Sequence, residues 1–96
     1  MEKEYIYNVL LKRGYDARMA QLVTEDLLQL HKSLSDYLQC WLKDESYEED
    51  FAAYGYSIYQ LQTERKMNYP AALLTMDWLL KEPEKAIESL KRKINT

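Results

Sequence analysis

Residues 16–43 read DARMAQLVTEDLLQLHKSLSDYLQCWLK, and this stretch decides the fold class. Apolar residues recur in it at alternating spacings of three and four, which places them on one face of a helix. The members of this stripe are Ala20, Val23, Leu27, Leu30, Leu34, Tyr37 and Trp41. No Gly or Pro occurs between Gly14 and Gly55, so nothing in the sequence forces a break. We therefore predict one long helix over about 16–43, capped by Asp16.

The apolar face of this helix is wide. Leu22, Leu28 and Leu42 lie outside the stripe, and the positions flanking the stripe are mostly uncharged. A coiled coil would carry complementary charges there, so the pattern favours packing by several neighbours of the same fold. An alternative breaks the helix near His31, with Ser33 as the cap of a new helix. The unbroken phase of the stripe favours a continuous or kinked helix instead.

Length and composition predict one all-α domain that spans residues 1–96. Of these 96 residues 47% are hydrophobic, and only two Gly and two Pro are present, which leaves little sequence for loops. Residues with β-branched side chains are few, which argues against a sheet. Gly14 is suited to end a first helix over about 2–12, because glycine tolerates a left-handed backbone. We expect a compact bundle of five or six helices.

A short helix is predicted to start within the acidic run of residues 44–50. Ser46 and Glu49 fit a capping box at its start, and Gly55 ends it. The side chains that would share one face of this helix are Tyr47, Phe51 and Tyr54.

Three more helices complete the predicted bundle. Ser57 is suited to cap a helix over about 57–66. Pro70 falls in the first turn of a helix over about 70–82, which is apolar nearly all round and is expected to be the most buried element. Pro83 opens the last helix. The residues of its inner face are Ala86, Ile87, Leu90 and Ile94.

Charge and cysteine content restrict the environment. The net charge of −3 repels a phosphate backbone unless the cations gather on one side of the protein. Cys40 is the only cysteine, which excludes an internal disulfide and fits a reducing cytosol. We find neither a signal peptide nor an apolar run long enough for a membrane span. We expect a soluble cytoplasmic protein that does not bind membranes.

Few residues are of the kind that carries catalysis or binds a metal. His31 and Cys40 are nine residues apart, which on one helix points them in opposite directions. A four-ligand zinc site needs more such residues. Cys40 stands beside Trp41, so we interpret it as a buried structural thiol. A Gly-rich phosphate loop is excluded, since the chain has only two distant glycines. We expect no catalytic residue, cofactor or metal.

A cluster of aromatic residues is the best candidate for a partner surface. Tyrosine is common in recognition surfaces because it buries a large area at low entropic cost and keeps a polar end. The alternative is a core lined by rings whose hydroxyl groups reach water. The candidate partner-surface residues are Tyr47, Phe51, Tyr54, Tyr56 and Tyr59.

The acidic run next to this cluster has two interpretations. It contains five carboxylates within residues 44–50. Such a run attracts a basic partner. It is also typical of a solvated helix start, where carboxylates complement the helix dipole.

A DNA-binding hypothesis rests on the helices expected at about 57–66 and 70–82. Their spacing has the dimensions of a helix-turn-helix, in which the second helix reads the bases. That helix carries Asp77 and Glu82 against the single cation Lys81, and its other side chains are mostly apolar. A reading helix needs exposed polar and basic groups. Nucleic acid is therefore not the partner that we favour.

Residues 10–15, Leu-Leu-Lys-Arg-Gly-Tyr, are followed by a predicted helix. This segment resembles the helix-loop-helix start of ubiquitin-associated domains, where a Gly and an aromatic residue stand in the first loop. The resemblance covers at most residues 4–43 and implies a break near Ser33. Arg13 stands where those domains usually have Met. We transfer no binding residue from this likeness and assign no family.

The sequence thus favours a small non-catalytic interaction or regulatory protein whose partner is another protein or a second copy of itself. The alternative is a helix-turn-helix regulator that binds nucleic acid. An enzyme is the third possibility, and it requires a pocket with perturbed carboxylates, such as Glu25 or Asp26 near His31.

Overall fold

The computed structural model describes the backbone of residues 2–94 and the side chains up to residue 92. Six helices and one two-stranded antiparallel sheet make up this part of the chain, which confirms the all-α prediction. The helices and strands form two compact units, an N-terminal unit (Met1–Tyr47) and a C-terminal unit (Glu48–Thr96). The single domain expected from the length of the chain stays a prediction.

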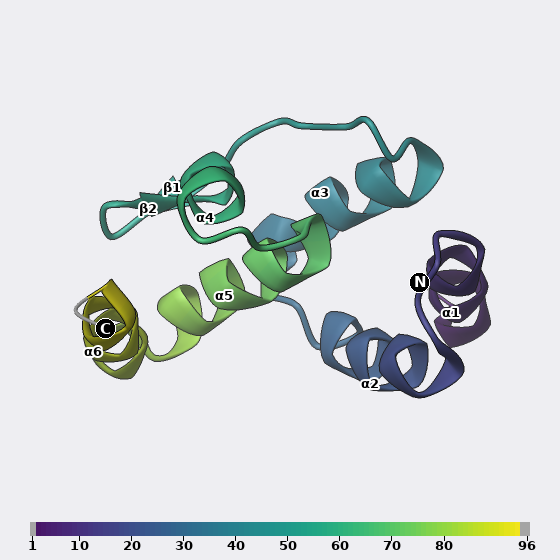
Figure 1. Cartoon of the computed structure of the whole chain (residues 1–96), viewed down its shortest axis with the longest axis horizontal. Coiled ribbons are helices and arrows are strands. Elements are labelled where there is room, and N and C mark those ends of the chain that lie inside the picture. Colours follow the sequence, from purple (N-terminus) through teal and green to yellow (C-terminus); the bar gives the residue numbers. More distant parts are fainter. Residues whose placement is uncertain (1, 95–96) are drawn as a thin grey trace. The chain divides into compact units, whose positions relative to one another are not determined.

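The N-terminal unit consists of α1 (Lys3–Lys12), α2 (Ala17–Leu27) and α3 (Lys32–Lys43), and α1 and α2 pack against each other (Figure 1). Gly14 ends α1 as predicted. Its φ of 98° is left-handed, its N–H donates to Leu11 O, and Tyr15 N–H donates to Leu10 O. These two bonds form a Schellman motif, which satisfies carbonyl groups at the end of the helix. The Asp16 carboxylate caps α2 by accepting from Met19 N at 2.9 Å, also as predicted.

The single long helix predicted over 16–43 is wrong, because the chain leaves the helix at Leu28 and starts a new one at Lys32. The residue that caps α3 is His31, whose Nδ1 accepts from Ser33 N at 3.1 Å, and not Ser33 itself. All seven stripe residues are nonetheless buried or half-buried. The spacing of the stripe residues shows which side of each helix faces the interior. It does not show whether α2 and α3 form one continuous helix.

The C-terminal unit begins with a hairpin in place of the predicted short helix. Strands β1 (Ala52–Ala53) and β2 (Tyr56–Ser57) pair in antiparallel register, with Ala53 opposite Tyr56. The two turn residues, Tyr54 and Gly55, both have positive φ, at 56° and 82°. A two-residue turn of type I′ requires positive φ at both positions. Gly55 therefore turns a hairpin instead of ending a helix.

The capping box predicted at Ser46 and Glu49 is also wrong. The backbone N–H and the hydroxyl group of Ser46 both donate to one carboxylate oxygen of Asp44, at 3.0 and 2.7 Å. These bonds close a local turn in which Asp44 is the acceptor, so Ser46 is not free to cap a helix.

Three helices follow the hairpin, namely α4 (Ile58–Glu64), α5 (Tyr69–Lys81) and α6 (Pro83–Ile94). Ser57 caps α4 as predicted, with its hydroxyl group accepting from Gln60 N at 3.1 Å. The connection to α5 passes through Lys66, whose φ of 58° is left-handed, and Asn68 caps α5 through Ala71 N.

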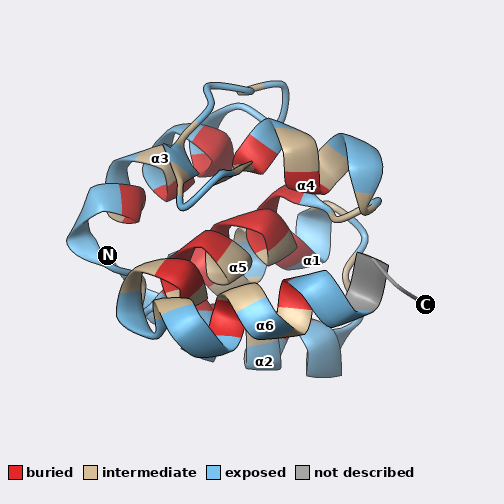
Figure 2. Ribbon diagram, turned by 90° about the vertical axis from the view of Figure 1, so that its left-hand side faces the viewer, coloured by how far each residue is buried: buried red, intermediate tan, exposed pale blue. Residues whose placement is uncertain are grey.

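Helix α5 is buried along most of its length, which confirms the buried helix predicted over 70–82 (Figure 2). Its fully or almost fully buried residues are Tyr69, Pro70, Ala72, Leu73, Met76, Asp77 and Leu79. It packs against both α4 and α6. The inner face of α6 has Ala86 and Leu90 buried and Ile87 half-buried as expected, while the side chain of Ile94 lies outside the described residues.

Candidate functional site

The five predicted partner-surface residues belong to two different units and differ in exposure. Tyr47 is the last residue of the N-terminal unit and is half-buried, whereas the other four belong to the C-terminal unit. Tyr54 and Tyr59 are exposed, at 55% and 64% of their surface. Phe51 and Tyr56 are half-buried. The expectation that Tyr47, Phe51 and Tyr54 share one helical face is therefore wrong, and the candidate site reduces to Tyr54 and Tyr59.

Tyr54 is presented at the tip of the hairpin. Its left-handed backbone costs an ordinary L-residue about 1 kcal/mol or more, and Asn, Asp and Gly are favoured at this turn position. The chain thus places a large aromatic side chain where local stability favours a small polar one, and more than half of its surface is open to solvent.

Tyr59 is held at the start of α4 by Asp50. One carboxylate oxygen of Asp50 accepts from the N–H groups of both Phe51 and Tyr59, each at 2.9 Å. Ile58 N donates to Phe51 O at 3.1 Å, so the first N–H groups of α4 all have acceptors when the Ser57 cap is included. The sequence does not signal this role of Asp50, because the cap stands nine positions before the helix residue that it serves.

The acidic segment beside this cap is held by the fold at one further point. The hydroxyl group of Tyr69, a buried residue of α5, donates to the backbone oxygen of Glu49 at 3.4 Å. The side chains of Glu48 and Glu49 are exposed and form no ion pair with any cation that the structure describes. Their carboxylates are therefore available to a ligand, while the carboxylate of Asp50 is engaged in capping.

Tyr56 has a structural role. The guanidinium group of Arg65 lies 5.9 Å from the centre of the Tyr56 ring, within the range of a cation–π contact. The same guanidinium donates to Leu90 O of α6 at 2.9 Å. Tyr56 is thus half-buried beneath an arginine that links α4 to α6, and it is not part of the exposed aromatic pair.

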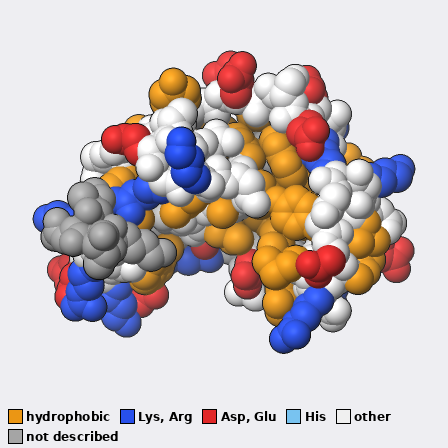
Figure 3. Space-filling view, in the orientation of Figure 1, with side chains coloured by type: hydrophobic (Ala, Val, Ile, Leu, Met, Phe, Trp, Pro, Cys, Tyr) orange, Lys and Arg blue, Asp and Glu red, His pale blue; other side chains and the backbone are white. Residues whose placement is uncertain are grey.

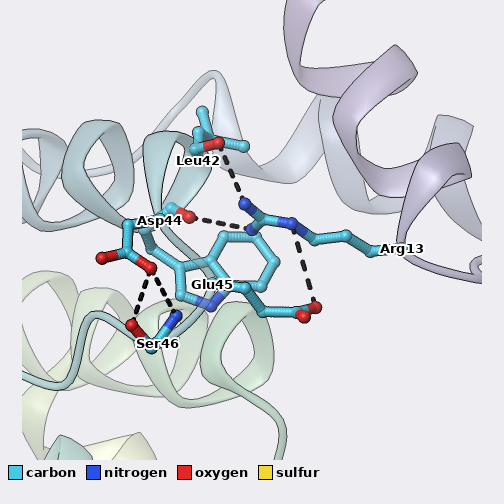
Figure 4. A network of polar contacts seen from close by, with 6 residues as sticks. Arg13, Leu42, Asp44, Glu45 and Ser46 are labelled. Carbon is cyan, nitrogen blue, oxygen red and sulfur yellow. Dashed lines mark hydrogen bonds and ion pairs between the residues drawn. The ribbon is translucent and has the colours of Figure 1, made fainter.

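A second polar network lies in the N-terminal unit and centres on Arg13 (Figure 4). Its guanidinium group donates to Trp41 O at 2.8 Å and to Leu42 O at 3.0 Å, and it forms an ion pair with Glu45 at 3.8 Å. It also lies over the Trp41 ring, 4.3 Å from the centroid. Arg13 therefore satisfies carbonyl groups in the last turn of α3. Nothing in the local sequence signals these contacts, because the carbonyl groups belong to residues that are 28 and 29 positions away from Arg13.

Two pKa values near this network are shifted by structural causes. Burial raises the pKa of the Tyr15 hydroxyl, an effect that Arg13 partly opposes and Glu45 reinforces. The pKa of the Asp44 carboxyl lies below its ordinary value because Ser46 donates hydrogen bonds to it, first from its side chain and then from its backbone. Both shifts follow from local hydrogen bonding and packing, and neither brings an acid and a base together.

The two residues with reactive side chains lie apart from these networks. Cys40 is exposed, so the expected buried thiol is wrong. The buried face of α3 carries Leu34, Leu38, Trp41 and Leu42, and Cys40 falls on the opposite side of the helix. His31 serves as a helix cap. The described residues contain no group of three or more His, Cys, Asp or Glu side chains placed to hold a metal ion.

Exposed apolar side chains are also present on the N-terminal unit, where Figure 3 shows hydrophobic side chains gathered at the surface. The large exposed apolar side chains of this unit come from α1, from α2 and from the residue that follows α2. The large exposed members are Tyr5, Leu11, Met19, Leu22 and Leu28. Sequence reasoning took Leu22 and Leu28 as part of a wide buried face, and the structure places both at the surface.

Glu25, one of the two carboxylates considered for catalysis, pairs with Lys3 at 3.6 Å, and Asp26 is exposed. Within the described part of the chain, no helix combines the length and the apolar character needed to cross a membrane. No protein-family model matches the sequence, and neither a curated protein nor a solved structure matches it.

Proposed function

We propose that this chain is a small non-catalytic interaction module that binds a protein partner through Tyr54 and Tyr59. The observation that carries this proposal is the exposure of Tyr54 at a turn position where its backbone is strained. Strained residues persist where the surrounding structure over-determines them, and they cluster at functional sites. A cytoplasmic location is part of the same proposal and rests on the lone cysteine.

Tyr59 supports the same surface from a rigid element. Its backbone is fixed by the Asp50 bond at the start of α4, and 64% of its surface is exposed. A tyrosine side chain has only two rotatable torsions, so it loses little conformational entropy when it becomes buried against a partner. A tyrosine at such a position is therefore an effective anchor for binding.

The alternative, a helix-turn-helix regulator built on α4 and α5, has less support. The second helix of that motif must present its side chains to the DNA groove. In α5, all of whose residues are described, Lys81 is the only exposed one, and it pairs with Asp77 at 2.9 Å. Salt-sensitive binding to random-sequence DNA at micromolar protein would favour this alternative over our proposal.

The proposal is tested by retention of partners on the immobilised chain from an extract of the cells that express it. The informative variant is Tyr54→Asn with Tyr59→Leu, which removes both exposed rings and keeps a residue suited to each backbone position. The matched control is Tyr5→Leu, which removes an exposed tyrosine from α1.

We expect a partner that the wild type and the control retain and the double variant loses. Retention that is equal for all three chains contradicts the proposal. Light scattering coupled to size exclusion, over a tenfold range of concentration, identifies the case in which the partner is a second copy of the chain.

A further inference from the structure

We propose that the segment of the partner that docks on Tyr54 and Tyr59 is basic, with a Lys or Arg side chain packed on the Tyr59 ring and paired with Glu48 or Glu49. This inference rests on the proposed function and adds the chemistry of the partner. The exposed aromatic pair supplies the contact area, and the negative charge of its segment selects a basic occupant.

The segment that carries the aromatic pair has charges of one sign. Residues 48–60 contain three carboxylates and no Lys, Arg or His. Asp50 uses its carboxylate to cap α4, whereas Glu48 and Glu49 are exposed and unpaired among the described residues. A partner that covers this surface must either neutralise these two charges or desolvate them without compensation, and the second outcome is costly.

The fold keeps the acidic segment next to Tyr59. Asp50 is bonded to the backbone of Tyr59, and the bond from Tyr69 to Glu49 O fixes the preceding residue. A ligand cation is therefore offered a carboxylate and an aromatic face by two neighbouring parts of one compact unit. Tyr54 follows Asp50 by four residues, through the two-residue strand β1, so their Cα atoms lie at most roughly 13 Å apart at about 3.3 Å per residue, which a short extended peptide spans.

The chain itself uses the same pairing of arginine with an aromatic ring. Arg13 lies over Trp41 and Arg65 lies over Tyr56, and each guanidinium also satisfies carbonyl groups. The negative face of an aromatic ring attracts a cation, and an adjacent carboxylate adds to that attraction. Tyr59 and Tyr54 present rings with neighbouring negative charge and no cation of their own segment.

The test uses a fluorescent octa-arginine peptide as the probe, with an octa-glutamate peptide as its charge-reversed control. Binding to the intact chain is measured by fluorescence anisotropy, and the binding site is located from the amide resonances of Tyr54 and Tyr59. The first variant is Glu48→Gln with Glu49→Gln. Its matched control is Glu64→Gln with Glu84→Gln, two exposed and unpaired carboxylates of the same unit that change the net charge equally.

We expect the basic peptide to bind and the acidic peptide not to bind. The Glu48/Glu49 variant is expected to weaken binding by about fivefold or more. Loss of one ring, in Tyr54→Asn or in Tyr59→Leu, is expected to weaken it by about twofold to fivefold. The control is expected to change it by less than about twofold, and added salt should weaken binding throughout. Equal weakening by both pairs of glutamates overturns the inference, since only net charge would then matter. The inference is also overturned if a partner needs the two tyrosines for binding but binds the Glu48/Glu49 variant as tightly as the wild type. That outcome leaves the proposed function intact.

Discussion

The guanidinium group of Arg13 lies 4.3 Å from the centroid of the Trp41 ring and donates to the backbone oxygen of that same residue at 2.8 Å. Arg13 follows the last residue of α1, and Trp41 stands in the last turn of α3. The Arg13 side chain, which is 14% exposed, thus stacks on the Trp41 ring and also donates to carbonyl groups at the end of α3, the helix that carries Trp41. This contact fixes where α3 ends against the turn between α1 and α2.

Loss of this contact is expected to be costly. Arg13→Ala removes two hydrogen bonds from a charged donor and also the stacking on Trp41. A hydrogen bond to a charged group contributes about 1.5–3 kcal/mol to stability. We expect the free energy of unfolding to fall by about 2–3 kcal/mol in urea titrations followed by circular dichroism. Arg13→Lys should recover only part of this loss, because an ammonium group does not reproduce the planar fork.

The control for this experiment is Arg18→Ala, which removes an exposed arginine that forms no ion pair with the residues that the structure describes. Surface substitutions of this kind usually change stability by less than about 0.5 kcal/mol. A similar loss for both variants would show that Arg13 contributes only its charge.

Thr24 offers a substitution that should stabilise the protein. Its side chain is fully buried in α2, and its hydroxyl oxygen has no hydrogen-bond partner among the described residues. A buried unsatisfied polar group costs about 1–3 kcal/mol, so Thr24→Val, which keeps the shape and removes the hydroxyl group, is expected to gain about 1 kcal/mol. The readout is a higher urea midpoint at unchanged slope. Thr24→Ser keeps the hydroxyl group and loses a methyl group, so it should lower the midpoint. A gain from Ser as large as that from Val would contradict this explanation.

Features that depend on a few adjacent residues could be predicted from the sequence. Gly14 ends α1, Asp16 and Ser57 cap the helices that follow them, and the apolar run after Pro70 forms the buried helix. Each of these is decided by the side chain or the backbone freedom of one residue and by the pattern that follows it.

Features that depend on contacts between distant residues could not be predicted. The helix breaks within a run that contains no Gly or Pro, and the new helix is capped by His31, which is not among the favoured cap residues. Gly55 suits both a helix end and a type I′ turn, and the partner strand decides between them. Of the candidate surface, exposure selects Tyr54 and Tyr59, and exposure depends on how α4 and the hairpin pack.

The hairpin turn supplies a prediction on Gly55. A Cβ added there would meet no atom within 4 Å, so Gly55→Ala tests the backbone alone. Because φ is 82°, we expect the free energy of unfolding of Gly55→Ala to be lower by about 1 kcal/mol.

Tyr54→Asn should raise the free energy of unfolding by about 0.5 kcal/mol, because Asn is favoured at a left-handed turn position. Thermal unfolding measures both variants, and Tyr54→Val, with a β-branched residue at positive φ, should be less stable than either wild type or Tyr54→Asn.

Asp44 supplies a prediction on pH. Its folded-state pKa lies below the ordinary value of 3.8, because Ser46 donates to the carboxylate from its hydroxyl group and its backbone. A carboxyl group whose pKa is lowered on folding stabilises the protein above its unfolded-state pKa, and this stabilisation is lost as the pH falls through the folded-state pKa.

A carboxyl-carbon NMR titration should therefore give Asp44 a midpoint below 3.8. Ser46→Ala should move that midpoint upward without reaching the ordinary value, since the backbone donor remains. The melting temperature of Asp44→Asn should fall less steeply into acid than that of the wild type. Asp36→Asn, at an exposed acid for which the structure gives no hydrogen bond, is the control. An Asp44 midpoint that Ser46→Ala leaves unmoved would assign the shift to another donor.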